Sequence, residues 1–222
     1  MKTPLADRIR PKTLDEVVGQ KHLIGEGKIL RNIIENDEVP NMIFYGPSGV
    51  GKTTIANIIA QKTGKTLHRL NATTASVADI KNIVSTLDSF LAMDGVLLYL
   101  DEIQHFNKKQ QQSLLEFMEN GKITLIASTT ENPYFEVNSA LISRSIVFEL
   151  KSLEKKDIDK LLLRAVSDTE KGMGAYGAVL DDDAREFLSD IAGGDARAAL
   201  NALELAILTT EKSEDGKIHI TL

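Results

Sequence analysis

A short glycine-rich run constrains the fold of this chain more than any other part of its sequence. The run is Gly46-Pro47-Ser48-Gly49-Val50-Gly51-Lys52-Thr53, which fits the pattern G-x-x-x-x-G-K-[ST]. The apolar residues 42–45 directly before it are typical of a buried strand, and residues 54–63 directly after it have the pattern of an amphipathic helix. A strand, a glycine-rich turn and a helix in this order gather backbone N–H groups around one anion. The run therefore predicts a phosphate-binding loop.

The residue types of this loop indicate which groups of a nucleotide it would hold. Glycines allow backbone N–H groups to turn inward around the β-phosphate, and we expect each residue from Gly46 to Thr54 to contribute to nucleotide binding. The ammonium group of Lys52 would reach the β- and γ-phosphates, and the hydroxyl of Thr53 would bind Mg²⁺. ATP and Mg²⁺ are therefore the predicted ligands.

Two adjacent carboxylates follow another apolar run. Residues 96–100 predict a buried strand, and Asp101 and Glu102 come directly after it. Asp101 would hold Mg²⁺, directly or through water, while Glu102 would orient and deprotonate the attacking water. Phosphoryl transfer needs little covalent help, so the placement of groups and the compensation of charge do most of the work. The pair predicts an Mg²⁺-dependent ATPase that converts ATP and water to ADP and phosphate.

Other polar residues are candidates for the site only because of their positions in the sequence. The strand at residues 123–128 ends in two threonines, and Thr130, or alternatively Thr129, could lie between the γ-phosphate and the attacking water. β-Branched residues are common in strands, so spacing alone assigns neither a role. Arg144 precedes the last predicted strand and Arg197 opens the last predicted helix, but a lone arginine is usually a solvated surface residue.

Apolar runs alternate with helical patterns over the first 150 residues. The strand-like runs are residues 42–45, 66–70, 96–100, 123–128 and 146–150, and the helical patterns between them are residues 54–63, 77–93 and 108–120. This alternation predicts a five-stranded parallel α/β sheet with helices on both faces. After Leu150, helical patterns cover residues 154–167, 181–192 and 196–209, and residues 216–222 suggest a turn and a short strand. We predict an α/β core over residues 1–150 and a small all-helical lid over residues 151–222.

Composition narrows the class of protein. The 222 residues include no cysteine, which excludes disulfides and thiol catalysis, and the four histidines have no metal-ligand spacing. We find neither an 18-residue apolar stretch nor a signal-peptide pattern, and so expect a soluble, cytoplasmic protein. The net charge of −6 makes the chain as a whole a poor nucleic-acid ligand, so any DNA contact has to come from a local patch or a partner.

The order of these motifs resembles AAA+ ATPases of the clamp-loader-related branch. More specifically, the chain is similar to the replication-associated recombination protein A family, whose eukaryotic relative is the Werner-helicase-interacting protein. The resemblance rests on residues 4–11 (Pro-Leu-Ala-Asp-Arg-Ile-Arg-Pro), 106–111 (Phe-Asn-Lys-Lys-Gln-Gln), 129–133 (Thr-Thr-Glu-Asn-Pro) and 135–141 (Phe-Glu-Val-Asn-Ser-Ala-Leu), and it covers the whole chain.

This resemblance implies roles for individual residues. Arg144 corresponds to the arginine finger that reaches the γ-phosphate bound by a neighbouring subunit, Arg197 to a lid arginine that senses nucleotide in its own subunit, and Thr130 to the polar sensor. Arg10, Pro11 and Val18 lie in segments similar to those that hold adenine. Asn71, which ends the second strand, either restrains Glu102 or forms a turn.

The chain departs from the family pattern in two ways. Many relatives have His-Arg where this chain has Gln104-His105, which removes a basic side chain just after Glu102. Relatives also continue for about as many residues again, into a helical region that builds a tetramer. We therefore expect the chain to be a fragment of a longer protein.

The family implies ATP-driven action on DNA at stalled replication forks, in a homo-oligomer that could contact single-strand-binding protein or replisome components. Three alternatives stay open. One is a clamp-loader subunit, although the bacterial catalytic ones often carry a zinc-binding cysteine cluster. Another is a Holliday-junction branch-migration motor, which would need a winged-helix domain. The last is a nucleotide-dependent binding module without turnover, which the presence of Glu102, Thr53 and Arg144 disfavours.

Overall fold

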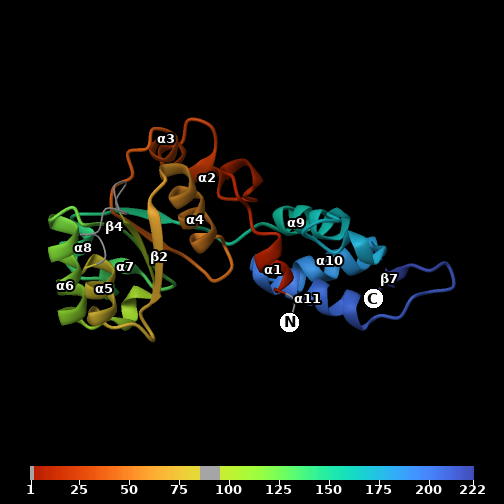
Figure 1. Cartoon of the computed structure of the whole chain (residues 1–222). Coiled ribbons are helices and arrows are strands. Elements are labelled where there is room, and N and C mark those ends of the chain that lie inside the picture. The colour runs from red at the N-terminus through yellow and green to blue at the C-terminus, as the bar shows by residue number, and fades with distance from the viewer. Residues whose placement is uncertain (1–2, 86–95) are drawn as a thin grey trace. The chain divides into compact units, whose positions relative to one another are not determined.

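The computed structural model describes residues 3–85 and 96–222 (Figure 1). These residues form two compact units. The sheet unit comprises residues 21–46 and 52–150. The helical unit comprises residues 3–20, 47–51 and 151–222. The part of the chain described here contains no helix that is both long and apolar enough to cross a membrane.

The sheet unit is built on five parallel strands among the described residues. They are β1 Met42–Tyr45, β2 Thr66–Asn71, β3 Val96–Asp101, β4 Ile123–Thr129 and β5 Ile146–Glu149. Their order in the sheet is β2-β3-β4-β1-β5, which confirms the predicted parallel α/β fold. β3 is buried over Val96–Leu100, as expected for a strand covered on both faces. The sheet therefore brings the carboxyl ends of β1, β3 and β4 to one edge, where open parallel sheets bind ligands.

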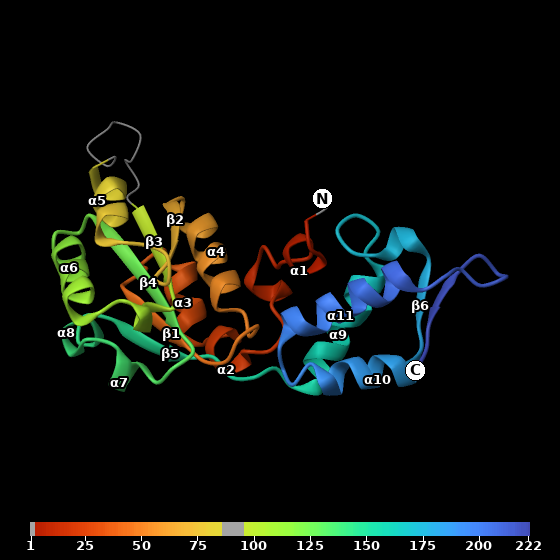
Figure 2. The same cartoon turned by 90° about the horizontal axis from the view of Figure 1, so that it is seen from below.

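Helices cover both faces of this sheet. In both views α3 and α4 lie on one face, whereas α5 and α6 lie on the other (Figures 1 and 2). The helices of the unit are α2 Lys21–Ile24, α3 Ile29–Glu35, α4 Lys52–Thr63, α5 Val77–Ser85, α6 Lys108–Glu119, α7 Pro133–Glu136 and α8 Ser139–Ile142, with a 3₁₀ turn at Ile103–His105. The predicted helix over residues 77–93 is observed to residue 85, and its remainder lies outside the described residues. A reciprocal capping box between Asn107 and Gln110 starts α6, with both hydrogen bonds at 2.9 Å.

The helical unit has its own core. Its helices are α1 Leu5–Arg8, α9 Lys155–Ser167, α10 Asp182–Ile191 and α11 Ala196–Thr209, with 3₁₀ turns at Leu14–Glu16 and Gly174–Tyr176. The prediction that this part is all helical is wrong, because β6 Ala178–Leu180 and β7 Ile218–Ile220 pair in parallel. The pattern at residues 216–222 indicated one strand, but its partner is a three-residue segment too short to show a periodicity of its own.

The first 20 residues group differently from the predicted division at residue 150. Leu5 and Ile9 are fully buried in the helical unit's core, among side chains such as Leu162 and Leu203. Glu204 on α11 accepts hydrogen bonds from the Leu5 backbone N–H and from the Arg8 guanidinium, both at 2.9 Å. The sequence shows two apolar residues four apart, which marks one buried helix face but does not say which unit buries it.

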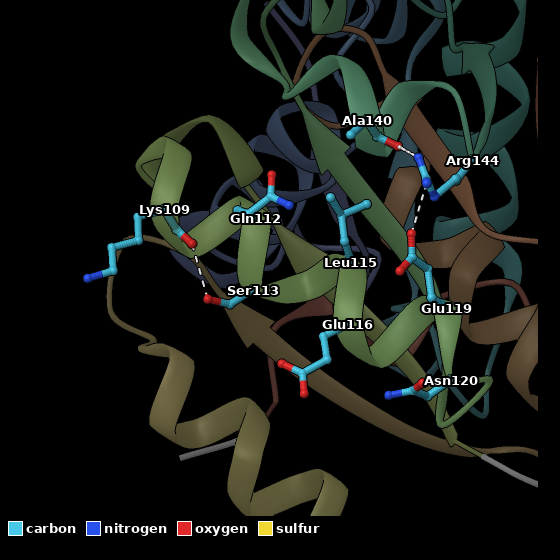
Figure 3. Close-up of a pocket in the computed structure, with 9 residues that line it drawn as sticks. All are labelled: Lys109, Gln112, Ser113, Leu115, Glu116, Glu119, Asn120, Ala140 and Arg144. Carbon is cyan, nitrogen blue, oxygen red and sulfur yellow. Dashed lines mark hydrogen bonds and ion pairs between the residues drawn. The ribbon is translucent and has the colours of Figure 1, made fainter.

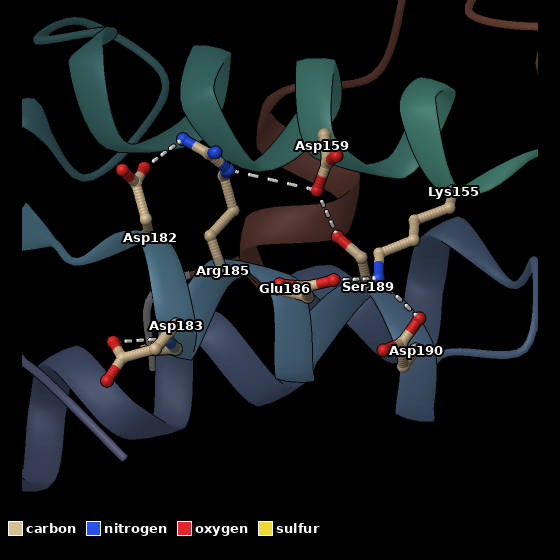
Figure 4. A network of polar contacts seen from close by, with 9 residues as sticks. Lys155, Asp159, Asp182, Asp183, Arg185, Glu186, Ser189 and Asp190 are labelled. Carbon is tan, nitrogen blue, oxygen red and sulfur yellow. Dashed lines mark hydrogen bonds and ion pairs between the residues drawn. The ribbon is translucent and has the colours of Figure 1, made fainter.

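A polar network joins α9 and α10 (Figure 4). The Lys155 ammonium pairs with Glu186 at 2.7 Å and with Asp190 at 2.9 Å. Asp159 accepts a hydrogen bond from Ser189 and lies 3.8 Å from the Arg185 guanidinium. Pairs as exposed as those of Lys155 contribute little stability individually. The buried Ser189 hydroxyl, by contrast, needs its partner, so this network fixes how the two helices face each other.

Candidate functional site

Glycine geometry explains the phosphate-binding loop. Gly46, Gly49 and Gly51 have φ angles of 143°, 68° and 107°, which residues other than glycine rarely adopt. A Cβ atom on Gly46 would lie 2.0 Å from the carbonyl oxygen of Leu150, so no larger residue fits there. The Gly46 N–H donates to the Thr129 carbonyl at 3.2 Å and continues the ladder between β1 and β4. The loop is thereby anchored at the carboxyl end of the sheet.

Lys52 begins α4 and is buried, with 8% of its surface exposed. Its ammonium donates to the carbonyl oxygen of Gly46 at 2.6 Å, across the mouth of the loop. A buried ammonium needs a compensating acceptor. A phosphate oxygen offers a stronger, charge-assisted one than a carbonyl.

A chain of hydroxyl groups connects the loop to the carboxylates. Thr53 Oγ1 lies 3.0 Å from the Tyr99 hydroxyl, which donates to Ser128 Oγ at 2.9 Å, and Ser128 in turn donates to Asp101 Oδ1. Tyr99 and Ser128 are both buried. Burial, followed by the nearby Asp101 charge, raises the pKa of Tyr99 to about 12, so its hydroxyl stays protonated.

The direction of these hydrogen bonds leaves oxygen lone pairs that a cation could use. Each hydroxyl has one proton to donate, so the consistent order runs from Thr53 to Tyr99, to Ser128, and finally to Asp101. With its proton directed to Tyr99, the Thr53 oxygen keeps lone pairs for a metal ion. Hydroxyl and carboxylate oxygens are hard ligands of the kind that Mg²⁺ takes together with water. The residues present therefore fit Mg²⁺.

Sequence reasoning missed Tyr99 and Ser128. One signal was available for Tyr99, a lone hydroxyl in an otherwise aliphatic strand, two positions before Asp101 and hence on the same face of β3. Ser128 carried no such signal, because its contact depends on the pairing of β3 with β4.

Glu102 lies at the end of β3 in a left-handed conformation, with φ 55°. Its Oε2 accepts hydrogen bonds from Gln104 Nε2 and, at 3.4 Å, from Thr130 Oγ1. A non-glycine residue at positive φ costs on the order of 1–3 kcal/mol, and such outliers cluster at functional sites. Thr129 is fully buried and accepts the Glu131 N–H at 3.0 Å, so it is Thr130 that faces Glu102.

Asn71 does not contact Glu102 in the described hydrogen bonds. Its Oδ1 accepts the backbone N–H of Thr73 at 2.9 Å and the hydroxyl of Thr73 at 2.7 Å. This is an Asx turn at the end of β2, which agrees with the turn-forming alternative.

Arg144 lies just after α8, and its side chain is 44% exposed. It pairs with Glu119 at 2.8 Å and donates to the Ala140 carbonyl at 3.1 Å and to Ser143 Oγ at 3.3 Å (Figure 3). All three partners belong to α6, α8 or the residue that follows α8. An exposed arginine in this position can be reached from outside the subunit.

Within the helical unit, the start of α11 contacts Gly49, a loop residue that belongs to the same unit. Asp195 caps α11 by accepting from the backbone N–H groups of Arg197 and Ala198 at 2.8 and 2.9 Å. The same carboxylate packs so closely on Gly49 that a Cβ there would lie 1.8 Å from it. The Ala196 N–H donates to the Gly49 carbonyl at 3.2 Å. Arg197 itself is exposed, one residue beyond this contact.

The segments predicted to hold adenine belong to the same unit. Arg10 is partly buried and forms an ion pair with the aspartate three residues before it, while Pro11 is partly exposed. Val18 packs on the unit's apolar core. Gln20 is buried, and its amide donates to the Lys151 carbonyl at 2.7 Å and to a carbonyl in the phosphate-binding loop at 3.3 Å. This segment is therefore tied to the loop.

We expect Tyr99→Phe to weaken Mg²⁺-nucleotide binding roughly threefold and to lower the free energy of unfolding by about 1 kcal/mol, because Thr53 and Ser128 lose their shared partner. Nucleotide titrations with and without Mg²⁺, together with urea unfolding, would measure both effects. Tyr134→Phe, which removes an exposed hydroxyl, is the control. An equal loss of affinity with and without Mg²⁺ would mean that the hydroxyl supports folding and not the metal site.

Comparisons with known proteins agree with this geometry. Residues 9–137 match the family model of the Holliday junction DNA helicase RuvB P-loop domain, and residues 174–222 match that of an AAA C-terminal domain. The replication-associated recombination protein A of Bacillus subtilis strain 168 is 43% identical over 220 residues, which is 99% of this chain and 51% of that protein. Its Escherichia coli K12 counterpart is 41% identical over 96% of this chain and 48% of its own length.

The similarity extends to a solved structure. The Holliday junction branch migration motor RuvB of Thermotoga maritima superposes with a TM-score of 0.74 at 26% identity, over 89% of this chain and 64% of that one. The chain spans about half the length of the curated relatives it matches. From the loop, the strand order and these matches, the chain belongs to the replication-associated recombination protein A family of AAA+ ATPases and carries a P-loop domain of the RuvB type.

Proposed function

We propose that this chain binds ATP with Mg²⁺ and hydrolyses it at a site completed by a neighbouring subunit. The observation that carries the proposal is the hydroxyl chain from Thr53 through Tyr99 and Ser128 to Asp101. It joins the loop that would hold the phosphates to the strand end that supplies Glu102. Two sequence motifs about 50 residues apart thereby meet at one sheet edge, as phosphoryl transfer requires.

Nucleotide binding would depend on Lys52, on α4 and on the residues proposed to hold Mg²⁺ and adenine. Lys52 would exchange the Gly46 carbonyl for a phosphate oxygen, and the N-terminus of α4 would add its positive end. Thr53 and Asp101 would hold Mg²⁺, which when bound neutralises charge on the phosphate oxygens. Arg10, Pro11 and Val18 would lie beside the adenine.

Hydrolysis would then depend on Glu102, which would take a proton from water as the water oxygen bonds to the γ-phosphorus. The bond from that phosphorus to the β–γ bridging oxygen breaks, and the leaving group is ADP. Thr130 and Gln104 hold Oε2 of Glu102, so its other oxygen is available to the water. Lys52 and Arg144 of a neighbouring subunit would compensate the developing charge. Arg197 would report nucleotide within its own subunit.

DNA at stalled replication forks is the proposed target. The support is similarity, since the relatives are named for replication-associated recombination and the RuvB structure for branch migration of Holliday junctions. A homo-oligomer, with single-strand-binding protein or replisome components as possible partners, and a cytoplasmic location complete the proposal. Because the net charge is −6, DNA affinity should be modest and should fall steeply with salt.

The test combines a nucleotide titration with phosphate release. We expect ATP to bind in the presence of Mg²⁺, and forked DNA to stimulate turnover more than a linear duplex of equal length. The turnover per subunit should rise with protein concentration, because each site needs a second subunit. Absence of nucleotide binding would overturn the proposal. Binding without turnover at any concentration, with or without DNA, would favour the alternative of a non-hydrolysing binding module.

A further inference from the structure

Arg144 and Glu119 lie at one end of a polar groove. The groove has a volume of about 580 Å³ and is formed mainly by the exposed side of α6, with Ala140 and Arg144 at its rim (Figure 3). From α6 it is lined by Lys109, Gln112, Ser113, Leu115, Glu116 and Glu119, followed by Asn120. The guanidinium is held here at three points, by the Ala140 carbonyl, the Ser143 hydroxyl and the Glu119 carboxylate.

We propose that Glu119 is a positioning residue, which orients Arg144 for the active site of the neighbouring subunit. The inference rests on the proposed function, since it assumes that Arg144 acts on a neighbour's nucleotide. Glu119 would touch neither nucleotide nor water. Its contribution passes through the guanidinium, and it belongs to the subunit that donates Arg144.

The place of Glu119 in its helix supports this role. It is the last residue of α6, and a carboxylate at a helix C-terminus is disfavoured by the helix dipole. The Glu119 carboxylate therefore does not stabilise α6 itself. The carboxylate gains its favourable interaction from Arg144, which lies just after α8 and 25 positions further along the chain.

The contacts of the Arg144 guanidinium also support a positioning role for Glu119. One terminal nitrogen donates to the Ala140 carbonyl and to Ser143, while the other faces Glu119, so the planar fork is held from two sides. Both charged side chains are about half exposed, at 44% and 51%. Such a pair is weak enough to leave Arg144 available to a phosphate, yet it limits the rotamers that a long side chain would otherwise sample.

The test places Glu119→Ala on a chosen side of the subunit interface. Glu102→Gln subunits would be mixed with Arg144→Ala subunits, so that a working site forms only where an intact Glu102 meets an intact Arg144. Glu119→Ala is then added either to the Glu102→Gln subunit, which donates the arginine, or to the Arg144→Ala subunit, which does not. Glu116→Gln on the donating subunit is the matched control, because Glu116 is exposed in the last turn of α6 and lines the same groove.

We expect Glu119→Ala on the donating subunit to lower kcat about three- to fivefold, the upper part of the range for an exposed ion pair, and to leave KM for ATP unchanged. On the other subunit it should have no effect, and neither should the control. Glu119→Asp on the donating subunit should restore part of the rate. A general loss of stability would follow the variant to either subunit, and that result would overturn the inference.

Two further outcomes separate this inference from the proposed function. If the mixture is active and Glu119→Ala on the donating subunit leaves kcat unchanged, Glu119 has no positioning role while Arg144 keeps its own. If Glu102→Gln and Arg144→Ala subunits do not complement each other at all, the arginine does not act between subunits. The proposed site and the role of Glu119 then both fail.

Discussion

Glu102→Gln is expected to bind ATP and Mg²⁺ normally and to lose at least about a hundredfold in turnover, the usual lower range for removing a general base. The amide has nearly the same shape as the carboxylate but cannot take a proton from water. Gln104 and Thr130 would still find an acceptor, because the amide oxygen can replace Oε2. Nucleotide affinity measured by titration, and phosphate release measured at saturating ATP, separate binding from chemistry.

A matched substitution controls for the lost charge. Glu136→Gln removes a carboxylate from an exposed position on α7 in the same unit, and both binding and turnover should stay unchanged. Wild-type turnover in Glu102→Gln would remove Glu102 from the mechanism. A loss of nucleotide affinity together with turnover would instead give the residue a role in binding.

Arg144→Ala is expected to lower turnover by about 10³–10⁵-fold without changing nucleotide affinity, which is the range seen when an arginine supplied to a phosphoryl-transfer site is missing. The side chain lies on the surface of its own subunit, held by Glu119 and α8, so its removal should leave the phosphate-binding loop of that subunit intact. Steady-state hydrolysis and nucleotide titration of the same preparation would show this separation of effects.

Mixing subunits that carry different substitutions distinguishes an arginine that acts on a neighbouring subunit from one that supports its own subunit. Glu102→Gln and Arg144→Ala subunits, each inactive alone, should recover part of the wild-type rate when combined. Arg69→Ala, which removes an exposed arginine from the edge strand β2, should behave as wild type throughout. Normal hydrolysis by Arg144→Ala in an assembled oligomer would exclude the finger role.

Local sequence was sufficient to predict the phosphate-binding loop and the strands around it. Positive φ angles at Gly46, Gly49 and Gly51 are a property of residue type, and a buried parallel strand is apolar along its whole length. The helices α4, α6 and α9 to α11 were likewise visible in their periodicity, and their observed bounds lie within two residues of those predicted. Each of these features depends on residues that are neighbours in the chain.

Contacts between distant segments were decided by the tertiary structure. Ser128 reaches Asp101 only because β3 and β4 pair in a register that sets Leu100 opposite Ala127. Similarly, Glu119 pairs with Arg144 because α8 packs against α6, and no spacing in the sequence predicts that contact.

The grouping of residues into units was also decided by the tertiary structure. The apolar face of Leu5 and Ile9 is evident in the sequence, but whether it packs on the sheet or on α11 depends on which surface offers complementary side chains. The short strand β6 is defined by its pairing with β7, nearly 40 residues later. A periodic pattern reports which side of an element is buried, whereas hydrogen bonds and ion pairs require two specific partners at one distance, which exist only after the chain has folded.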